Sequence, residues 1–257
     1  MKENWRVWDK DKEYGDLFYK RAIGELPEME SSKSLAKKVN EIIQENDRIL
    51  DVGCGAGHYL RSLDKIIKTN FSYTGIDQTA YYIERAKEAF SLKVNSNSLR
   101  SKTDFKVGDI FNIPVDDNKS DIVICNNVFL HLPSIQKPLE ELIRVSKKYI
   151  IIRTLIGASS FRIKQVEQPE SYDLNGEPIN YHYYNIYSEG YIQELLENIS
   201  FKMDFSFEDD LDYDPSAFGN SDNFVGKRPD DLTTSINGIQ LNIYILQPWK
   251  FLIIEKK

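Results

Sequence analysis

The sequence predicts an α/β protein whose core is an open, mostly parallel β-sheet with helices on both faces. Apolar runs of strand length alternate with helical periodicity through the first 156 residues, as in repeated strand–helix–strand units. Residues 120–125 are apolar without alternation, which is typical of a central strand buried on both sides. Two apolar runs flank Gln247-Pro248 near the C-terminus, and we expect them to form an antiparallel pair that closes the sheet.

Each element follows from its pattern. Leu35, Val39 and Ile42 recur at helical spacing, so residues 31–44 should form a helix with one buried face. The helices expected on the same grounds are a short one within residues 5–24, then 31–44, 60–67, 80–90, 138–145 and 188–199. The strands expected are residues 48–52, 73–77, 104–109, 120–125, 149–153, 201–207, 241–246 and 249–255.

Composition excludes several classes of protein. Of 257 residues, 41% are hydrophobic and 28% charged, and the formal net charge of -7 gives no general attraction for phosphate backbones, so we expect no nucleic-acid partner. No apolar run approaches the roughly 18 residues of a membrane span, and the charged opening is unlike a signal peptide, so we expect a cytoplasmic protein with no membrane partner. Cys54 and Cys125 are either small buried apolar groups or neighbours on adjacent strands, and no spacing predicts a metal site.

A glycine-rich loop follows the first strand. Gly53, Gly55 and Gly57 allow a sharp turn and let a ligand approach backbone N–H groups. Their spacing is Gly-x-Gly-x-Gly, which differs from the Gly-x-Gly-x-x-Gly of dinucleotide-binding folds. Asp51, at the end of the strand, is placed to face a cationic group or to cap the next helix.

Acidic residues also end the second and third strands. Asp77 and Asp109 would each, taken alone, be a turn residue or a helix cap as readily as a ligand contact. The carboxyl ends of parallel strands meet at one edge of an open sheet, where ligands bind. Three acids at consecutive strand ends therefore favour a binding site.

Over residues 48–153 these motifs resemble, in order and spacing, the class I S-adenosylmethionine-dependent methyltransferases that act on small molecules. The resemblance implies a Rossmann-like seven-stranded sheet with an antiparallel last strand and S-adenosylmethionine as cofactor, giving S-adenosylhomocysteine. It also implies that Asp77 binds the ribose hydroxyls and that Asp109 faces the adenine amino group. The expected cofactor contacts are Asp51, Gly53, Cys54, Gly55, Gly57, Asp77, Gln78, Asp109, Ile110, Asn126 and Tyr14.

The resemblance divides the chain into three regions. Residues 1–30, with the aromatics Trp5, Trp8, Tyr14, Phe18 and Tyr19, should form a lid, or a helix packed on the sheet edge, and residues 31–156 the cofactor-binding core. Residues 157–257 should complete the same domain, with substrate-covering insertions at 157–187 and 208–237.

The acceptor site is less defined. His58 should be structural or lie near the cofactor carboxylate, whereas His131 and His182 are the candidate catalytic bases, with a structural role open for each. Residues proposed to bind substrate, which could instead pack or form ion pairs, are Tyr19, Arg153, Tyr181, Tyr183 and Tyr184.

The predicted activity is methyl transfer to nitrogen or oxygen of a small polar acceptor, such as a nucleotide sugar or a precursor of a surface polysaccharide. The alternative is a catalytically inactive cofactor-binding subunit with a regulatory or scaffold role, and the glycine spacing disfavours a nicotinamide-dependent oxidoreductase. Both a monomer and a homodimer are compatible with the sequence.

Overall fold

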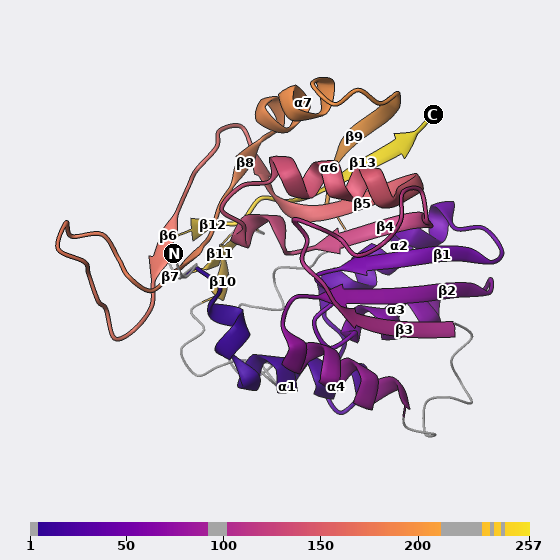
Figure 1. Cartoon of the computed structure of the whole chain (residues 1–257), viewed down its shortest axis with the longest axis horizontal. Coiled ribbons are helices and arrows are strands. Elements are labelled where there is room, and N and C mark those ends of the chain that lie inside the picture. The colour runs from indigo at the N-terminus through magenta and orange to yellow at the C-terminus, as the bar shows by residue number, and fades with distance from the viewer. Residues whose placement is uncertain (1–4, 92–101, 212–232, 237–238, 243–244) are drawn as a thin grey trace.

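A computed structural model describes residues 5–91, 102–211, 233–236, 239–242 and 245–257. Figure 1 shows a central twisted sheet between two layers of helices. The strands run in the order β3-β2-β1-β4-β5-β13-β9, and β8 (Tyr187–Ser188) pairs with the end of β5. Their bounds are β1 Asp47–Val52, β2 Phe71–Asp77, β3 Lys102–Val107, β4 Ser120–Asn126, β5 Ser146–Gly157, β9 Met203–Asp209 and β13 Trp249–Lys256.

Strand directions agree with the predicted fold class. β1 pairs in parallel with β2 and β4, β2 with β3, and β4 with β5. β13 lies antiparallel to both β5 and β9. The prediction of an α/β fold with a mostly parallel sheet and an antiparallel last strand is confirmed; among the described residues, seven strands lie in one row, and the two-residue β8 adds an eighth at the end of β5.

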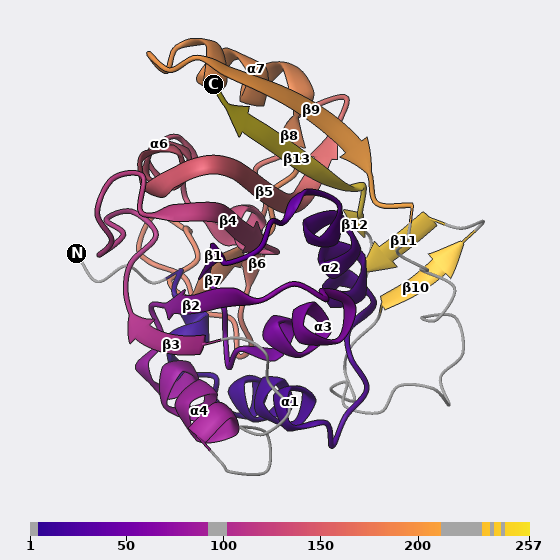
Figure 2. The same cartoon turned by 90° about the vertical axis from the view of Figure 1, so that its right-hand side faces the viewer.

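Alternate residues of each strand feed two hydrophobic cores. Leu50 and Val52 of β1 point to a core shared with α6 (Gln136–Val145) and α7 (Glu189–Glu197). Ile49 points to the other face, which is covered by α2 (Glu30–Ile42), α3 (His58–Ile66) and α4 (Ala80–Ser91) (Figure 2). Cys125 belongs to the first core and Cys54 to the second, where each is a buried free thiol packed as a small apolar group.

The expected pairing of the last two strands was wrong. The run predicted at 241–246 is divided between β11 (Ile239–Asn242) and β12 (Ile245–Leu246), which form a separate antiparallel sheet with β10 (Thr233–Ile236). Pro248 accepts a hydrogen bond from the Ile156 N–H at 2.9 Å, so the chain enters β13 already paired with β5. The neighbour of β13 on its other side is β9, predicted as a strand at 201–207.

The N-terminal segment consists of a 3-10 turn and a helix, where the sequence predicted one short helix. The turn η1 (Val7–Lys10) is followed by α1 (Lys12–Ile23), whose N-terminus is capped when Asp11 accepts from the Tyr14 N–H at 3.0 Å. Asp16 of α1 accepts hydrogen bonds from Tyr81 (2.7 Å) and Arg85 (2.8 Å), which dock this helix on α4. We call residues 5–24 the covering segment.

The first predicted insertion, 157–187, contains a hairpin made of β6 (Lys164–Val166) and β7 (Tyr181–Tyr183), which projects from the sheet (Figure 1). Of the second predicted insertion, 208–237, the ends belong to β9 and β10, and residues 212–232 lie outside the described residues. Among the described helices, none is long and apolar enough to cross a membrane.

Candidate active site

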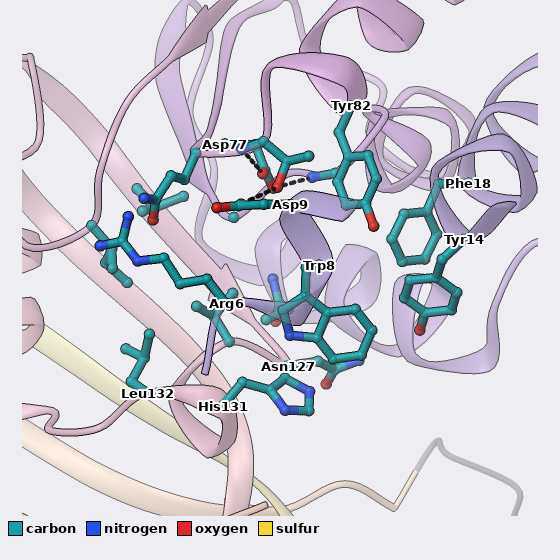
Figure 3. Close-up of a pocket in the computed structure, with 18 of the residues that line it drawn as sticks. Arg6, Trp8, Asp9, Tyr14, Phe18, Asp77, Tyr82, Asn127, His131 and Leu132 are labelled. Carbon is teal, nitrogen blue, oxygen red and sulfur yellow. Dashed lines mark hydrogen bonds between the residues drawn. The ribbon is translucent and has the colours of Figure 1, made fainter. Parts of the chain in front are cut away.

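A pocket lies at the carboxyl ends of β1, β2 and β4, beneath the covering segment (Figure 3). One end is lined by the glycine loop, Asp77 and Gln78. The other end is lined by Asn126, Asn127 and His131, which follow β4. Trp8, from the covering segment, lies between the two ends in Figure 3. One cavity therefore joins the strand ends that were predicted to meet at one edge of the sheet.

Glycine is required in the loop by both backbone and space. Gly53 and Gly55 have φ values of 82° and 55°, which other residues adopt only with strain. A Cβ added to Gly53 would lie 2.3 Å from Cγ2 of Val128, and one added to Gly55 would lie 2.9 Å from Cδ2 of Phe18. The loop therefore lies close to its neighbours and presents bare backbone to the pocket.

Asp77 stabilises the loop from the end of β2. Its Oδ2 accepts a hydrogen bond from the Gly55 N–H at 2.9 Å, and its Oδ1 accepts from the Thr79 N–H at 2.9 Å. Burial raises the pKa of this carboxyl group, and the charge of Asp9 raises it further against the lowering effect of those two bonds. Asp77 still lines the pocket, where each oxygen keeps the capacity for another hydrogen bond.

Asp51, which we expected to face a cationic group, lies behind the loop instead. It is buried and accepts a hydrogen bond from the Tyr73 hydroxyl at 2.6 Å. Burial raises its pKa to about 7, with a smaller contribution from the charge of Asp77. Cys54 and Gly57 also lie outside the pocket lining, because the loop turns those residues toward the core: Cys54 is buried, and Gly57 is the N-cap of α3.

Asp109 also differs from its expected place. Its Oδ1 accepts from the Phe111 N–H at 2.9 Å, and its Oδ2 forms an ion pair with Arg6 of the covering segment at 3.3 Å. The pocket is lined here by Gly108 and Ile110, which flank Asp109. Arg6 therefore stands beside the carboxylate that we expected to face the adenine.

His131 is held in one tautomer by the inserted hairpin. Its Nδ1 lies 2.9 Å from the backbone oxygen of Tyr183, and because a carbonyl can only accept, Nδ1 carries the proton. Nε2 is then an acceptor. Burial lowers the pKa of His131 to about 4, so the ring is neutral at pH 7. Trp8 packs edge-on against it, with ring centroids 5.0 Å apart.

The other two histidines have different environments. His182 does not line the pocket; it is hydrogen-bonded to Glu167, and its ring centroid lies 6.0 Å from that of Trp8. His58 lines the pocket and stacks on Phe18 with ring centroids 4.2 Å apart. Burial lowers the pKa of His58 to about 3, and its Nδ1 has no hydrogen-bond partner among the described residues.

The five residues predicted to bind substrate lie outside the pocket lining. Tyr19 faces away from the pocket, where its hydroxyl donates to Glu88 at 3.3 Å. Tyr181 packs against Tyr183, with ring centroids 5.4 Å apart, and Tyr183 in turn packs against Trp5. The Tyr184 hydroxyl accepts a hydrogen bond from the buried Gln247 side chain.

Arg153 belongs to a buried polar network under the pocket. Its Nε donates to Oδ2 of Asp210 at 2.6 Å, and both side chains are 1% exposed. Its guanidinium also donates to Oδ1 of Asn127 at 2.7 Å and lies 4.1 Å from the ring centroid of Trp249. Arg153 therefore orients Asn127, a pocket residue, without touching the pocket itself.

Several lining residues were not among the predicted contacts. Of these, Trp8 and Phe18 had a sequence signal, because the N-terminal aromatics predicted a lid. Asn127 follows the predicted contact Asn126 and adopts a positive φ (57°) after β4, which asparagine tolerates. The remaining unpredicted ones include Arg6, Asp9, Met29, Tyr59, Thr79 and Tyr82.

The pocket fits the cofactor that the motifs imply. Gly53 and Gly55 line the pocket with bare backbone, because a Cβ on either would collide with a neighbouring lining residue, and the Asp77 carboxylate can accept from ribose hydroxyls. The Asn126 carboxamide is buried at the pocket wall, and neither of its polar atoms has a partner among the described residues. A ligand with donors and acceptors at this depth would satisfy groups that the protein leaves unpaired.

Comparison with known proteins agrees with this geometry. A family model described as a methyltransferase domain matches residues 43–197, which is more than half of the chain. An uncharacterized methyltransferase of Schizosaccharomyces pombe is 31% identical over 106 residues, or 41% of this chain and 38% of its own length. A sterol 24-C-methyltransferase of the same yeast is 32% identical over 105 residues, or 41% of this chain and 26% of its own length. The match thus spans well under half the length of these curated relatives.

Solved structures show the same fold. A Methanosarcina mazei S-adenosylmethionine-dependent methyltransferase has a TM-score of 0.54 at 19% identity, covering 86% of this chain and 96% of that one. A Thermotoga maritima methyltransferase of the same kind has a TM-score of 0.53 at 13% identity, covering 98% and 100%. The chain belongs to the methyltransferase-domain family, with the class I fold whose cofactor is S-adenosylmethionine.

Proposed function

We propose that the chain is an enzyme that transfers the methyl group of S-adenosylmethionine to a nitrogen or oxygen atom of a small polar acceptor. The observation that carries the proposal is that one pocket joins Asp77 and the glycine loop to His131 and Asn127 beneath Trp8. The first group suits the cofactor, and the second suits an acceptor that approaches its methyl group.

The cofactor supplies an activated methyl group on a sulfonium, which an acceptor lone pair displaces in line. The protein then has to align the acceptor and exclude water. Trp8 packs between Tyr14 (centroids 5.2 Å apart) and His131, and this aromatic wall shields the reacting end of the pocket. Asn127, whose side chain is fixed by Arg153, lines the same end of the pocket.

His131 is proposed to orient the acceptor through Nε2. Because Nδ1 is committed to the Tyr183 carbonyl, Nε2 accepts a hydrogen bond from an acceptor N–H or O–H. A base whose pKa is about 4 is too weak to ionise an ordinary alcohol, so this geometry favours an amine or an already acidic hydroxyl. His182 is proposed to contribute indirectly, by packing against Trp8 while Glu167 holds its ring.

The charges in the pocket limit the acceptor. Among the described residues that line it, Arg6 is the cationic side chain, and Arg6 is paired with Asp109. For a nucleotide-linked sugar, or a precursor of a surface polysaccharide, we therefore propose that the sugar enters and the phosphates stay outside. A cytoplasmic setting is proposed from the free thiols of Cys54 and Cys125. The acceptor of the sterol methyltransferase is not carried over, since the similarity covers 41% of this chain.

Two measurements test the proposal. Calorimetric titration with S-adenosylhomocysteine should show binding, and a parallel titration with NADH should show none. Transfer of labelled methyl from S-adenosylmethionine is then measured against nucleotide sugars, amino sugars and aromatic amines. Binding of S-adenosylhomocysteine without transfer to any acceptor would favour the alternative, a cofactor-binding regulatory or scaffold subunit. Absence of binding by the folded chain would refute the enzyme assignment.

A further inference from the structure

We infer that Arg6 and Asp9 of the covering segment form part of the adenosine subsite, so that binding of the nucleoside holds Trp8 over the acceptor end of the pocket. This inference rests on the proposed function, because it takes the pocket to be the cofactor site. It assigns a ligand-binding role to two side chains that no motif in the sequence indicated.

The first observation is a carboxylate that faces Asp77 from the covering segment. Asp9 accepts a hydrogen bond from the Thr79 hydroxyl at 3.2 Å, while the Thr79 N–H donates to Asp77 at 2.9 Å. Thr79 thus donates to both carboxylates, so Asp9 and Asp77 lie around the same residue, and both line the pocket. Figure 3 shows Asp9 and Asp77 directed toward each other from opposite chain segments.

A vicinal diol matches this arrangement. Ribose presents two hydroxyl donors on adjacent carbons, and two carboxylates on either side can accept one each. Without such donors the two like charges repel, which is seen in the contribution of Asp9 to the raised pKa of Asp77. Hydrogen bonds to a charged acceptor are stronger than those between neutral groups. A bound diol would therefore offset the repulsion between the Asp9 and Asp77 carboxylates, and both would hold the ribose.

The second observation is the ion pair between Arg6 and Asp109. Arg6 stands three residues before Asp9, and its guanidinium reaches the end of the next strand along the sheet edge at 3.3 Å from Asp109. The covering segment is therefore fastened at both strand ends where we expect the ribose and the adenine. Arg6 itself also lines the pocket.

The third observation links these contacts to the acceptor end. Trp8 stands next to Asp9 on the four-residue turn η1 and packs 5.0 Å from His131. Trp8 and Asp9 are joined by one peptide bond within this turn, so a ligand that holds Asp9 also restrains Trp8. When the ribose binds Asp9, Trp8 is therefore fixed over the acceptor end at the same time. This coupling predicts that the cofactor binds before the acceptor is enclosed.

The test uses cofactor binding alone. S-adenosylhomocysteine and its 2′-deoxyadenosyl analogue are titrated into the wild type, Asp9→Ala and the control Glu13→Ala, in which an exposed carboxylate of the same segment is removed. Asp9 is exposed, so its replacement should leave folding intact. We expect Asp9→Ala to weaken S-adenosylhomocysteine binding about tenfold to a hundredfold, as for loss of a hydrogen bond to a charged group. The penalty for the missing hydroxyl should be smaller in this variant than in the wild type.

A second readout follows the covering segment. Saturating S-adenosylhomocysteine should protect the bonds after Lys10 and Lys12 from trypsin in the wild type and in Glu13→Ala, and protect them much less in Asp9→Ala. If Asp9 merely repels Asp77, its removal will tighten binding, and that result would overturn the inference, as would unchanged affinity with unchanged protection. If the wild type does not bind S-adenosylhomocysteine, the proposed function itself falls; if it binds and Asp9→Ala behaves identically, only this inference falls.

Discussion

Asp51→Asn tests how the buried carboxylate behind the glycine loop affects stability. Burial raises the Asp51 pKa from 3.8 to about 7. One pKa unit corresponds to 1.36 kcal/mol, so the folded protein disfavours the ionised carboxylate by about 4 kcal/mol. The replacement keeps the volume of the side chain and an oxygen that can accept from Tyr73, and it removes the charge.

The sign of the effect follows from proton binding. The folded state holds the Asp51 proton more tightly than the unfolded state, so this stabilising contribution is complete below about pH 4 and is lost as the pH rises to about 7. At pH 8 the wild type therefore bears the full cost of a buried charge, whereas the asparagine variant bears none. We expect the variant to be more stable than the wild type by up to about 4 kcal/mol at pH 8, with the difference shrinking toward pH 4.

Urea unfolding followed by tryptophan fluorescence at several pH values measures this difference. Tyr73→Phe is the matched control, because loss of the donor to Asp51 should raise the pKa of the carboxyl group further and extend the pH dependence upward. A stability difference between Asp51→Asn and the wild type that is the same at pH 4.5 and pH 8 would refute the reasoning, since it would show that the charge is not what the fold disfavours.

Three further outcomes are expected. Gly53→Ala should abolish S-adenosylhomocysteine binding in calorimetry, because its Cβ would lie 2.3 Å from Val128 at a φ of 82°; retained affinity would contradict the placement of the loop. His131→Gln should lower turnover about tenfold or more while cofactor affinity stays within about twofold, and a pKa of about 4 predicts no inflection from this residue between pH 6 and 9; such an inflection, lost in the variant, would contradict it. Arg153→Met should cost about 3–5 kcal/mol in urea unfolding by stranding the charge of Asp210, and Arg153→Met with Asp210→Leu should recover much of it; equal stability of single and double variants would argue against a coupled pair.

The parts of the fold set by local patterns were predictable. The glycine loop and the acid at position 77 follow strands whose apolar runs are unmistakable, and parallel strands of an α/β unit must deliver their ends to one edge. The pairing of the C-terminal strands was harder to predict. The run at 241–246 has the composition of a strand, but composition does not identify a partner, and the contact between Pro248 and Ile156 that decides it spans more than 90 residues of sequence.

Side-chain direction explains most of the differences in the site. Phe18 and Tyr19 are adjacent aromatics on α1, and successive residues of a helix are about 100° apart, so when Phe18 stacks on His58 the next ring faces away. The sequence around Arg153 did not indicate its ion-pair partner, because Asp210 lies 57 residues further along the chain. The ion pair forms because β13 lies between β5, which carries Arg153, and β9, which Asp210 follows.

The two halves of the pocket thus depend on different levels of the sequence. The cofactor half is made by strand ends that the fold itself brings together, so any chain with this pattern should form it. The proposed acceptor half comprises Trp8 of the covering segment, the turn after β4 and the inserted hairpin, whose Tyr183 carbonyl fixes His131. These pieces lie outside the parallel strands of the sheet, an arrangement that lets one fold serve many acceptors. Replacing the hairpin while keeping the sheet should therefore change the acceptor that is methylated and leave cofactor affinity nearly unchanged; parallel loss of both would show that the two halves are not separable.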